Sequence, residues 1–298
     1  MAGSRRPAGK NQLLILLTND DGIYAPGLAA MERELGRLGD VYVVAPATEQ
    51  SGVGHSITYL TPLIVKEVFR GEHRWGWAVE GSPADCVKIG VHEFCPRQPD
   101  LVVSGINSGL NAGINVLYSG TVAAAIEGAF YGITSVAVSL QFDEHAEYEK
   151  AARLAATIIE QIVEKGGPGP QLYNMNLPTA AIQGTARVAT VPMNVTRYGD
   201  RFERRTDPWG RVYYWLTGGP PKGTPGELTD LSALAEGCVT LTPLGYDMTR
   251  RPVLEQMREW DLDLEGFDTD WLPEDPARRE PVFRTARQTE RADSPDKI

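Results

Sequence analysis

Residues 13–27, LLILLTNDDGIYAPG, decide how the chain folds. The stretch begins with five apolar residues. An unbroken apolar run of this length indicates a strand that is buried on both faces, as in a parallel sheet. Residues 18–22, TNDDG, follow directly. They are therefore placed at the carboxyl end of the strand, which is where open α/β sheets bind their ligands.

The adjacent carboxylates Asp20 and Asp21 allow two interpretations. Two carboxylates side by side repel each other unless a cation or a proton lies between them, and oxygen ligands of this kind suit Mg²⁺, Mn²⁺ or Ca²⁺. Asn, Asp and Gly are also common turn formers. The segment alone therefore predicts either a cation site or a plain turn.

The composition limits the classes of function. The chain has 298 residues, and a 42% hydrophobic fraction is enough for a sizeable core. A formal net charge of −10 argues against binding to nucleic-acid polymers, which needs clustered Lys and Arg, although a bound metal can still attract a small anion. Three cysteines are too few for a disulfide framework and favour a cytoplasmic location. No apolar run approaches membrane-spanning length, so we expect no membrane partner.

Strands and helices alternate along the first part of the chain. The strand over 13–17, a helix from Pro26 to Gly39 and a buried strand over 41–45 form a βαβ unit with a right-handed crossover. The alternation continues with helices predicted over 83–94, 122–130 and 147–165 and strands predicted over 101–104, 135–140 and 172–177. This order predicts an α/β fold with a Rossmann-like, parallel or mixed sheet.

The pattern changes after Pro178. Strands predicted over 186–191, 202–206, 211–216 and 238–244 follow one another without the earlier alternation with helices. We expect a disordered lead over 1–11, an α/β catalytic core over 12–191, a β-hairpin arm over 192–250 and a charged, partly disordered helix and tail over 251–298. An isolated hairpin is at best marginally stable in water, so the arm either packs on a neighbouring subunit or folds back over its own domain.

Three loops follow predicted strands at their carboxyl ends, so we expect them to meet at one edge of the sheet. Oxygen ligands from separate loops are what a hard cation needs. The first loop supplies Asp20 and Asp21, the second supplies Ser51 and His55, and the third supplies Asn107, Ser108 and Asn111. His55 is interpreted either as a general base or, more simply, as a hydrogen-bonding residue of its loop.

The turn Ser119-Gly120-Thr121 precedes an alanine-rich helix. Backbone N–H groups point outward at a helix start and the helix dipole is positive there, so a phosphate can bind to them. A cation beside such an anion site suggests phosphoryl-ester chemistry. The simpler interpretation is that Ser119 and Thr121 only cap the helix, and that Gly105, Gly109 and Gly113 only serve tight turns.

Five motifs in a fixed order resemble the SurE survival-protein family of nucleoside monophosphate phosphatases. They are TNDDGIYAPGL, GHSIT with the serine loop before it, GSPADCVKIG, VVSGINSGLNAG and YSGTVAAAIEGAFYGI. The resemblance runs from about residue 13 to residue 244. The lead before it and the charged tail beyond Arg250 have no family role that we can assign.

The resemblance implies a SurE-like three-layer fold and one divalent cation per subunit, Mg²⁺ or Mn²⁺. It implies a homodimer or homotetramer in which the β-rich arm is exchanged between subunits. The residues that match the family's metal ligands are Asp20, Asp21, Ser51 and Asn107, and of these we expect Asp20, Asp21 and Asn107 to be catalytic. The predicted substrate and phosphate contacts are Asn19, Gly105, Ser108, Gly109, Asn111, Ser119, Gly120 and Thr121.

The predicted function is hydrolysis of nucleoside 5′- and 3′-monophosphates by a metal-dependent phosphoric monoester hydrolase. Water activated by the cation is the expected nucleophile, and attack by Asp20 or Asp21 on phosphorus is the alternative. Two other classes compete with this prediction. A dinucleotide-dependent oxidoreductase requires a G-x-G-x-x-G turn after the first strand, where this chain has Asn19-Asp-Asp-Gly. A non-catalytic nucleotide-binding stress protein would release no phosphate.

Overall fold

The computed structural model describes residues 12–167, 169–196, 199, 201–218 and 227–262. The predicted lead over 1–11 and most of the predicted charged tail therefore lie outside the described residues. The chain divides into two compact units, one that ends at Tyr246 and one that begins at Asp247. The second unit contains the short helix α7 (Arg251–Met257).

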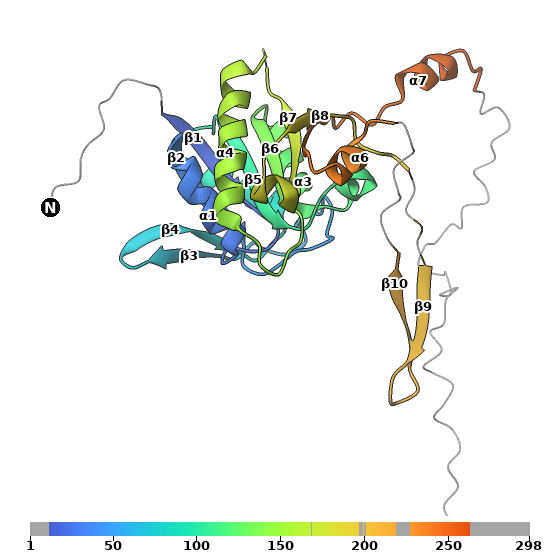
Figure 1. Ribbon diagram of the computed structural model, residues 1–298, viewed down its shortest axis with the longest axis horizontal. Coiled ribbons are helices and arrows are strands. Elements are labelled where there is room, and N and C mark those ends of the chain that lie inside the picture. Colours follow the sequence, from blue (N-terminus) through green and yellow to red (C-terminus); the bar gives the residue numbers. More distant parts are fainter. Residues whose placement is uncertain (1–11, 168, 197–198, 200, 219–226, 263–298) are drawn as a thin grey trace, which may run out of the picture. The chain divides into compact units, whose positions relative to one another are not determined.

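The first unit is built on a nine-stranded mixed sheet with the strand order β3-β4-β2-β1-β5-β6-β7-β11-β8 (Figure 1). All the pairs from β4 to β7 are parallel. Both β3 against β4 and β11 against β7 are antiparallel. The strands are β1 (Leu13–Thr18), β2 (Gly39–Pro46), β3 (Val65–Arg70), β4 (His73–Val79), β5 (Leu101–Ser108), β6 (Thr134–Leu140), β7 (Leu172–Leu177), β8 (Val188–Thr190) and β11 (Val239–Pro243). The predicted α/β fold with a parallel or mixed sheet is confirmed.

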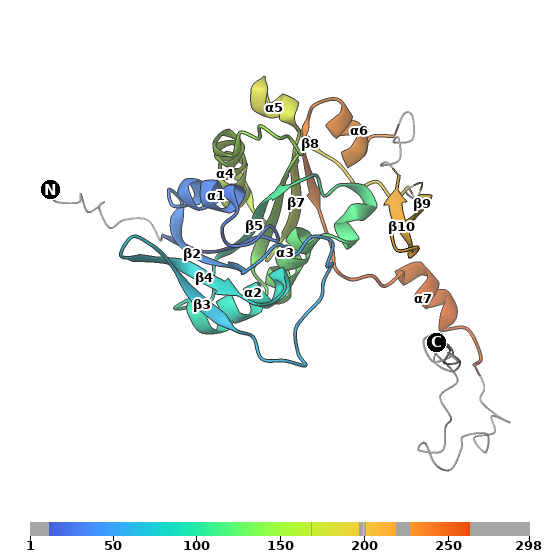
Figure 2. The ribbon, with the colours of Figure 1, turned by 90° about the horizontal axis from the view of Figure 1, so that it is seen from below.

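Helices cover both faces of the sheet, which gives three layers (Figure 2). Because side chains alternate between the faces of a strand, Ile15 and Leu17 join the core under α1 (Pro26–Leu35) and α4 (Tyr148–Lys165). Leu16 joins the core under α2 (Pro83–Ile89) and α3 (Gly120–Phe130). β1 is therefore buried on both faces, as its unbroken apolar run predicts. The shorter helical elements are η1 (Gly90–Phe94), η2 (Gly113–Leu117), α5 (Thr179–Gln183) and α6 (Asp230–Ala235).

Helix α1 packs closely over the sheet because Gly27 has no side chain. A Cβ atom at Gly27 would lie 2.2 Å from the Ile106 carbonyl oxygen of β5. The prediction that the helix reaches Gly39 is wrong, since α1 ends at Leu35 and Gly39 is the first residue of β2. A Cβ atom at Gly39 would lie 2.0 Å from the Leu13 carbonyl oxygen, so this glycine serves strand pairing.

The region after Pro178 differs in part from the predicted arm. β11 lies within the predicted span 192–250, yet it is a strand of the central sheet between β7 and β8. Thr240 and Thr242 of β11 are buried although they are polar, and its antiparallel pairing with β7 needs no crossover helix. A separate two-stranded antiparallel ribbon is formed by β9 (Arg201–Thr206) and β10 (Val212–Thr217). Within the described ranges, no helix is long and apolar enough to cross a membrane.

Candidate active site

The TNDDG segment forms a tight turn directly after β1. Asn19 and Asp20 are buried and Asp21 is half-buried. The Asn19 side-chain nitrogen donates to the Gly22 carbonyl oxygen at 2.9 Å. Gly22 has φ +97°, and a Cβ atom there would lie 3.3 Å from the Thr48 carbonyl carbon. The segment is therefore a turn, as the simpler interpretation predicts, and it is also where two carboxylates lie at the end of the central strand.

The loop after β2 is tied to this turn through the backbone. The Gln50 N–H donates to the Asp20 carbonyl oxygen at 2.7 Å, and the Ile23 N–H donates to the Pro46 carbonyl oxygen at 2.8 Å. These bonds hold the backbone directly before Ser51 against the aspartate turn. The Ser51 hydroxyl donates to the Glu49 carboxylate at 2.6 Å. The sequence analysis did not single out Glu49, although it lies only two residues before Ser51.

The end of β5 supplies the third side of the site. The strand runs to Ser108, further than the predicted 101–104, and its pairing with β6 shifts register between Ser104 and Asn107. An irregularity of this kind redirects side chains at a strand end. The Ser108 N–H donates to Asp21 Oδ2 at 3.0 Å, and the Asn107 side-chain nitrogen donates to the Gly109 carbonyl oxygen at 2.7 Å.

The start of α3 packs directly on Asp20. Ser119 is the N-cap, and its hydroxyl oxygen accepts the Val122 N–H at 3.1 Å. The Thr121 hydroxyl donates to Asp20 Oδ1 at 2.5 Å. A Cβ atom at Gly120 would lie 3.0 Å from the Asp20 Cβ, so a side chain there would crowd Asp20. The Ser119 oxygen serves as a cap, and both the hydroxyl and the backbone of Thr121 bond to Asp20. Of the predicted phosphate contacts in this turn, the Gly120 backbone N–H is the one for which the structure gives no competing role among the described residues.

Burial and repulsion raise the pKa values of both aspartates. The pKa of Asp21 rises from 3.8 to about 6, because of burial first and then the negative charges of Asp20 and Glu49, against the opposing bond from the Ser108 N–H. Burial also raises the pKa of Asp20, against the opposing hydrogen bonds from Thr121. Two carboxylates that lack a compensating positive charge are suited to a bound cation.

The chemistry of the available donors fits a hard divalent cation. In the part of the chain that the structure describes, no group of three or more His, Cys, Asp or Glu side chains could hold a metal. A cation here would therefore rely on two carboxylates together with neutral oxygens, which suits Mg²⁺ or Mn²⁺ better than Zn²⁺. The Asn19 Oδ1 atom is fully buried and has no hydrogen-bond partner among the described residues. An unsatisfied buried acceptor beside Asp20 is consistent with a ligand or an ordered water at this point.

Asn111 and His55 make structural contacts instead of facing the aspartates. The Asn111 side-chain nitrogen donates to the Ser139 hydroxyl at 2.8 Å, and its backbone N–H donates to Asn176 Oδ1 at 2.8 Å. His55 Nε2 lies 2.8 Å from Glu127 Oε2. The structure therefore favours the simpler interpretation of His55, as a hydrogen-bonding residue of its loop. Sequence analysis missed Glu127, which lies 72 residues further along the chain.

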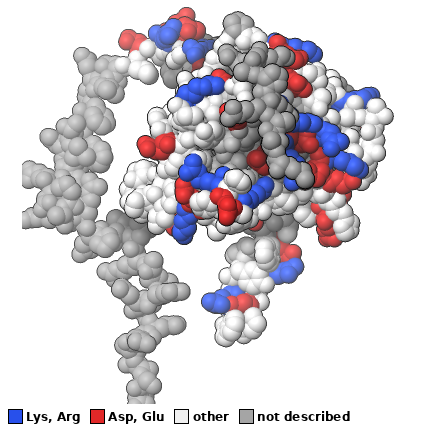
Figure 3. Space-filling model, turned by 90° about the vertical axis from the view of Figure 1, so that its left-hand side faces the viewer, with Lys and Arg blue, Asp and Glu red and all other residues white. Residues whose placement is uncertain are grey.

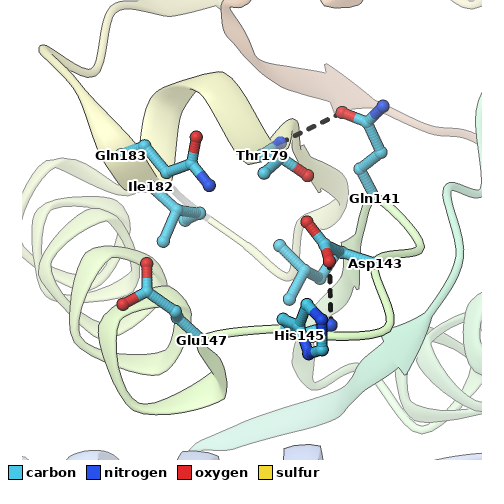
Figure 4. Close-up of a pocket in the computed structure, with 9 residues that line it drawn as sticks. Gln141, Asp143, His145, Glu147, Thr179, Ile182 and Gln183 are labelled. Atoms are coloured by element: carbon cyan, nitrogen blue, oxygen red, sulfur yellow. Dashed lines mark hydrogen bonds between the residues drawn. The ribbon is translucent and has the colours of Figure 1, made fainter.

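A small hollow lies away from the aspartates, after the carboxyl end of β6, and Figure 4 shows its lining. Its polar groups hold local turns. The Gln141 side-chain oxygen accepts the Thr179 N–H at 3.0 Å, and Asp143 Oδ1 accepts the His145 N–H at 2.8 Å (Figure 4). No catalytic arrangement is formed by these groups, so the aspartate turn remains the candidate site.

Comparisons with known proteins place this geometry in context. The family described as "Survival protein SurE" matches residues 15–204. The chain is 57% identical to the 5′-nucleotidase SurE of Rhodopirellula baltica over 249 residues, which cover 83% of this chain and 98% of that protein. It is 42% identical to the 5′-nucleotidase SurE of Heliobacterium modesticaldum, with coverage of 83% and 91%. The crystal structure of the SurE protein from Aquifex aeolicus superposes with a TM-score of 0.70 at 34% identity, and covers 82% of this chain and 98% of that one.

Proposed function

This chain belongs to the SurE survival-protein family, and on that premise we propose that it is a metal-dependent phosphomonoesterase that hydrolyses nucleoside 5′- and 3′-monophosphates. The relatives named 5′-nucleotidase support an enzyme that acts on nucleotides. The structural observation that carries the proposal is the contact between Asp20 and the start of α3. A carboxylate suited to a cation and a helix N-terminus suited to a phosphate are placed side by side.

In this proposal Asp20, Asp21, Ser51 and Asn107 hold one cation per subunit, Mg²⁺ or Mn²⁺. When bound, the cation supplies Lewis-acid chemistry that activates water and withdraws charge from the phosphoryl oxygens. Asp20 and Asp21 provide the negative charge of the site, and Thr121 fixes the orientation of the Asp20 carboxylate. Direct attack on phosphorus by an aspartate is disfavoured, because Asp20 is buried and both carboxylates already accept hydrogen bonds.

The protein's own donors orient the phosphate. The Gly120 backbone N–H lies at the positive end of the α3 dipole, whereas the Thr121 backbone and hydroxyl both bond to Asp20. Residues 105–109 are the other predicted phosphate contacts, and they lie beside Asp21, which accepts the Ser108 N–H. Asn19 is not one of these donors, because its side-chain nitrogen donates to the Gly22 carbonyl oxygen at 2.9 Å. Its buried Oδ1 is an acceptor, which suits the cation or a water and not a phosphate oxygen. These donors would stabilise the negative charge on the phosphate oxygens, both in the bound substrate and in the transition state.

The remaining features support small acidic substrates and self-association. On the face shown in Figure 3, basic and acidic side chains are interspersed instead of forming a basic patch, which is unlike a surface for nucleic-acid polymers. All residues of β9 and β10 are exposed. Because this ribbon carries large apolar side chains, we propose that it mediates a homodimer or homotetramer. The apolar side chains are Phe202, Val212, Tyr213, Tyr214, Trp215 and Leu216. The three cysteines form no disulfide, in keeping with a cytoplasmic location.

The test is a panel of nucleoside monophosphates assayed for released phosphate with Mg²⁺, Mn²⁺, Co²⁺ or no metal. We expect phosphate release that depends on the cation and that EDTA abolishes. Nucleotide binding without phosphate release under any metal would support the non-catalytic alternative. Oxidation of added NADH without phosphate release would support the oxidoreductase and overturn the proposal.

A further inference from the structure

Glu127 is a buried carboxylate that has no part in the chemistry proposed above. Its side chain is 4% exposed and lies on α3, the helix whose start contacts Asp20. One oxygen accepts from Lys88 Nζ of α2 at 2.8 Å, and the other lies 2.8 Å from His55 Nε2. Lys88 already supplies one positive charge, so the contact with His55 is not needed to neutralise Glu127.

His55 belongs to the loop that carries Ser51. Apart from the bond from Ser51 to Glu49 of the same loop, two hydrogen bonds tie residues 51–55 to the rest of the described chain. They are the Gly54 N–H to the Tyr118 carbonyl oxygen at 3.0 Å and the contact between His55 and Glu127. The His55 ring also stacks on Phe130, with ring centroids 5.3 Å apart. Each of these contacts leads to α3 or to the residue before its N-cap.

The middle of the same loop has little support of its own. Gly52 has φ +71°, and nothing lies within 4 Å of a Cβ atom built there. Ser51 is exposed and donates only to Glu49, which belongs to the same loop. A loop with few contacts opens at a low free-energy cost. The placement of Ser51 therefore depends on the bonds on either side of it. Gln50 bonds to Asp20 on one side, and on the other Gly54 bonds to Tyr118 and the His55 side chain bonds to Glu127.

We propose that the contact between Glu127 and His55 is a clamp that positions Ser51 beside Asp20 and Asp21, and thereby increases the affinity of the site for its divalent cation. This inference rests on the cation site of the proposed function. His55 acts through Ser51, so it is a positioning residue. α3 then has two roles, since its start packs on Asp20 and its later turn holds the serine loop.

The test compares His55→Ala with His55→Gln. Alanine removes the clamp and leaves Glu127 paired with Lys88, so the fold should persist. Glutamine keeps a side-chain N–H that can donate to Glu127. The matched control is His92→Ala, because His92 is an exposed histidine whose Nε2 lies 3.2 Å from the Tyr131 hydroxyl on the same helix end. Each protein is titrated with Mn²⁺ while free Mn²⁺ is followed by electron paramagnetic resonance.

We expect His55→Ala to weaken Mn²⁺ binding about tenfold, the lower end of the range for residues that support metal ligands. His55→Gln and His92→Ala should bind Mn²⁺ like the wild type. With saturating metal, kcat of His55→Ala should recover. In the metal-free protein, hydrogen exchange at the Gly54 amide should become faster in His55→Ala only.

Other outcomes separate the clamp from the proposed function. Unchanged Mn²⁺ affinity in His55→Ala, with normal binding by the wild type, overturns the clamp and leaves the phosphatase proposal intact. A loss of kcat in both His55 variants at saturating metal would make His55 a general base and would also overturn the clamp. No Mn²⁺ binding by the wild type would overturn both.

Discussion

Asp21→Asn should make the metal-free protein more stable at neutral pH while it weakens metal binding. The pKa of Asp21 is raised from 3.8 to about 6 by burial and by neighbouring carboxylates. Between about pH 4 and pH 6 the folded chain therefore holds a proton that the unfolded chain has lost. The stability that this proton provides is present below about pH 4 and is lost as the pH rises through about 6.

The size of the effect follows from the shift. At about 1.36 kcal/mol for each pH unit, a rise from 3.8 to about 6 corresponds to roughly 3 kcal/mol as an upper limit. Asp21 is only half-buried, so solvent screening reduces this to about 1–2 kcal/mol. Asparagine removes the charge and keeps an oxygen that can accept the Ser108 N–H. The melting temperature at pH 8 should therefore rise by about 2–6 °C.

The assay is thermal unfolding in EDTA between pH 4 and pH 8, followed by the same scans with added Mn²⁺. A suitable control is Asp143→Asn, because Asp143 also accepts a backbone N–H, at 2.8 Å, on another loop. We expect stabilisation of the metal-free protein in Asp21→Asn alone, together with a smaller gain from Mn²⁺ than in the wild type. A metal-free Asp21→Asn protein that melts below the wild type at pH 8 would refute the reasoning.

Three further predictions concern the site and the ribbon. Thr121→Val removes the hydrogen bond to Asp20 and should lower kcat/KM at limiting metal, by an amount that corresponds to roughly 1–3 kcal/mol of transition-state stabilisation. An unchanged kcat/KM would show that this bond has no role. Gly105→Ala should lower the free energy of unfolding by more than about 2 kcal/mol, because a Cβ atom there would lie 2.3 Å from a β6 carbonyl oxygen. Denaturant unfolding of the control Gly132→Ala should show a smaller loss, because nothing lies within 4 Å of a Cβ atom built at Gly132. Replacing the β9–β10 ribbon with a short glycine-serine linker should reduce the number of subunits per particle, as measured by light scattering. A monomeric full chain at micromolar concentration would contradict the proposed assembly.

Local sequence patterns predict the parts of the fold that depend on local chemistry. The apolar run of β1 indicates a strand buried on both faces, and the helix predicted to begin at residue 83 does begin there, as α2. β11 is harder to place, because Thr240 and Thr242 are polar but buried. Nothing in the segment shows that it returns to the sheet as an antiparallel neighbour of β7. The predicted arm was therefore too long at its carboxyl end.

The candidate site also has a part that the sequence predicts and a part that it does not. Asp20 and Asp21 can be predicted from the sequence, because two adjacent carboxylates at the carboxyl end of a buried strand indicate a cation site. The roles of Glu127 and of the Ser108 backbone depend on contacts across 72 and 87 residues, which no periodic pattern encodes. Asn111 has the same residue type as a ligand but belongs to a buried network with Asn174 and Asn176. Residue type alone does not separate these two uses of an asparagine.

The central claim is that Asp20, Asp21, Ser51 and Asn107 hold one divalent cation beside the start of α3. The most direct measurement is an anomalous difference map from crystals grown with Mn²⁺ and a nucleoside monophosphate. Our account predicts one strong peak per subunit in contact with these four side chains, with the phosphate density between that peak and the Gly120 backbone N–H. A Mn²⁺ peak bound by other residues, in crystals of a protein whose phosphate release requires Mn²⁺, would contradict it.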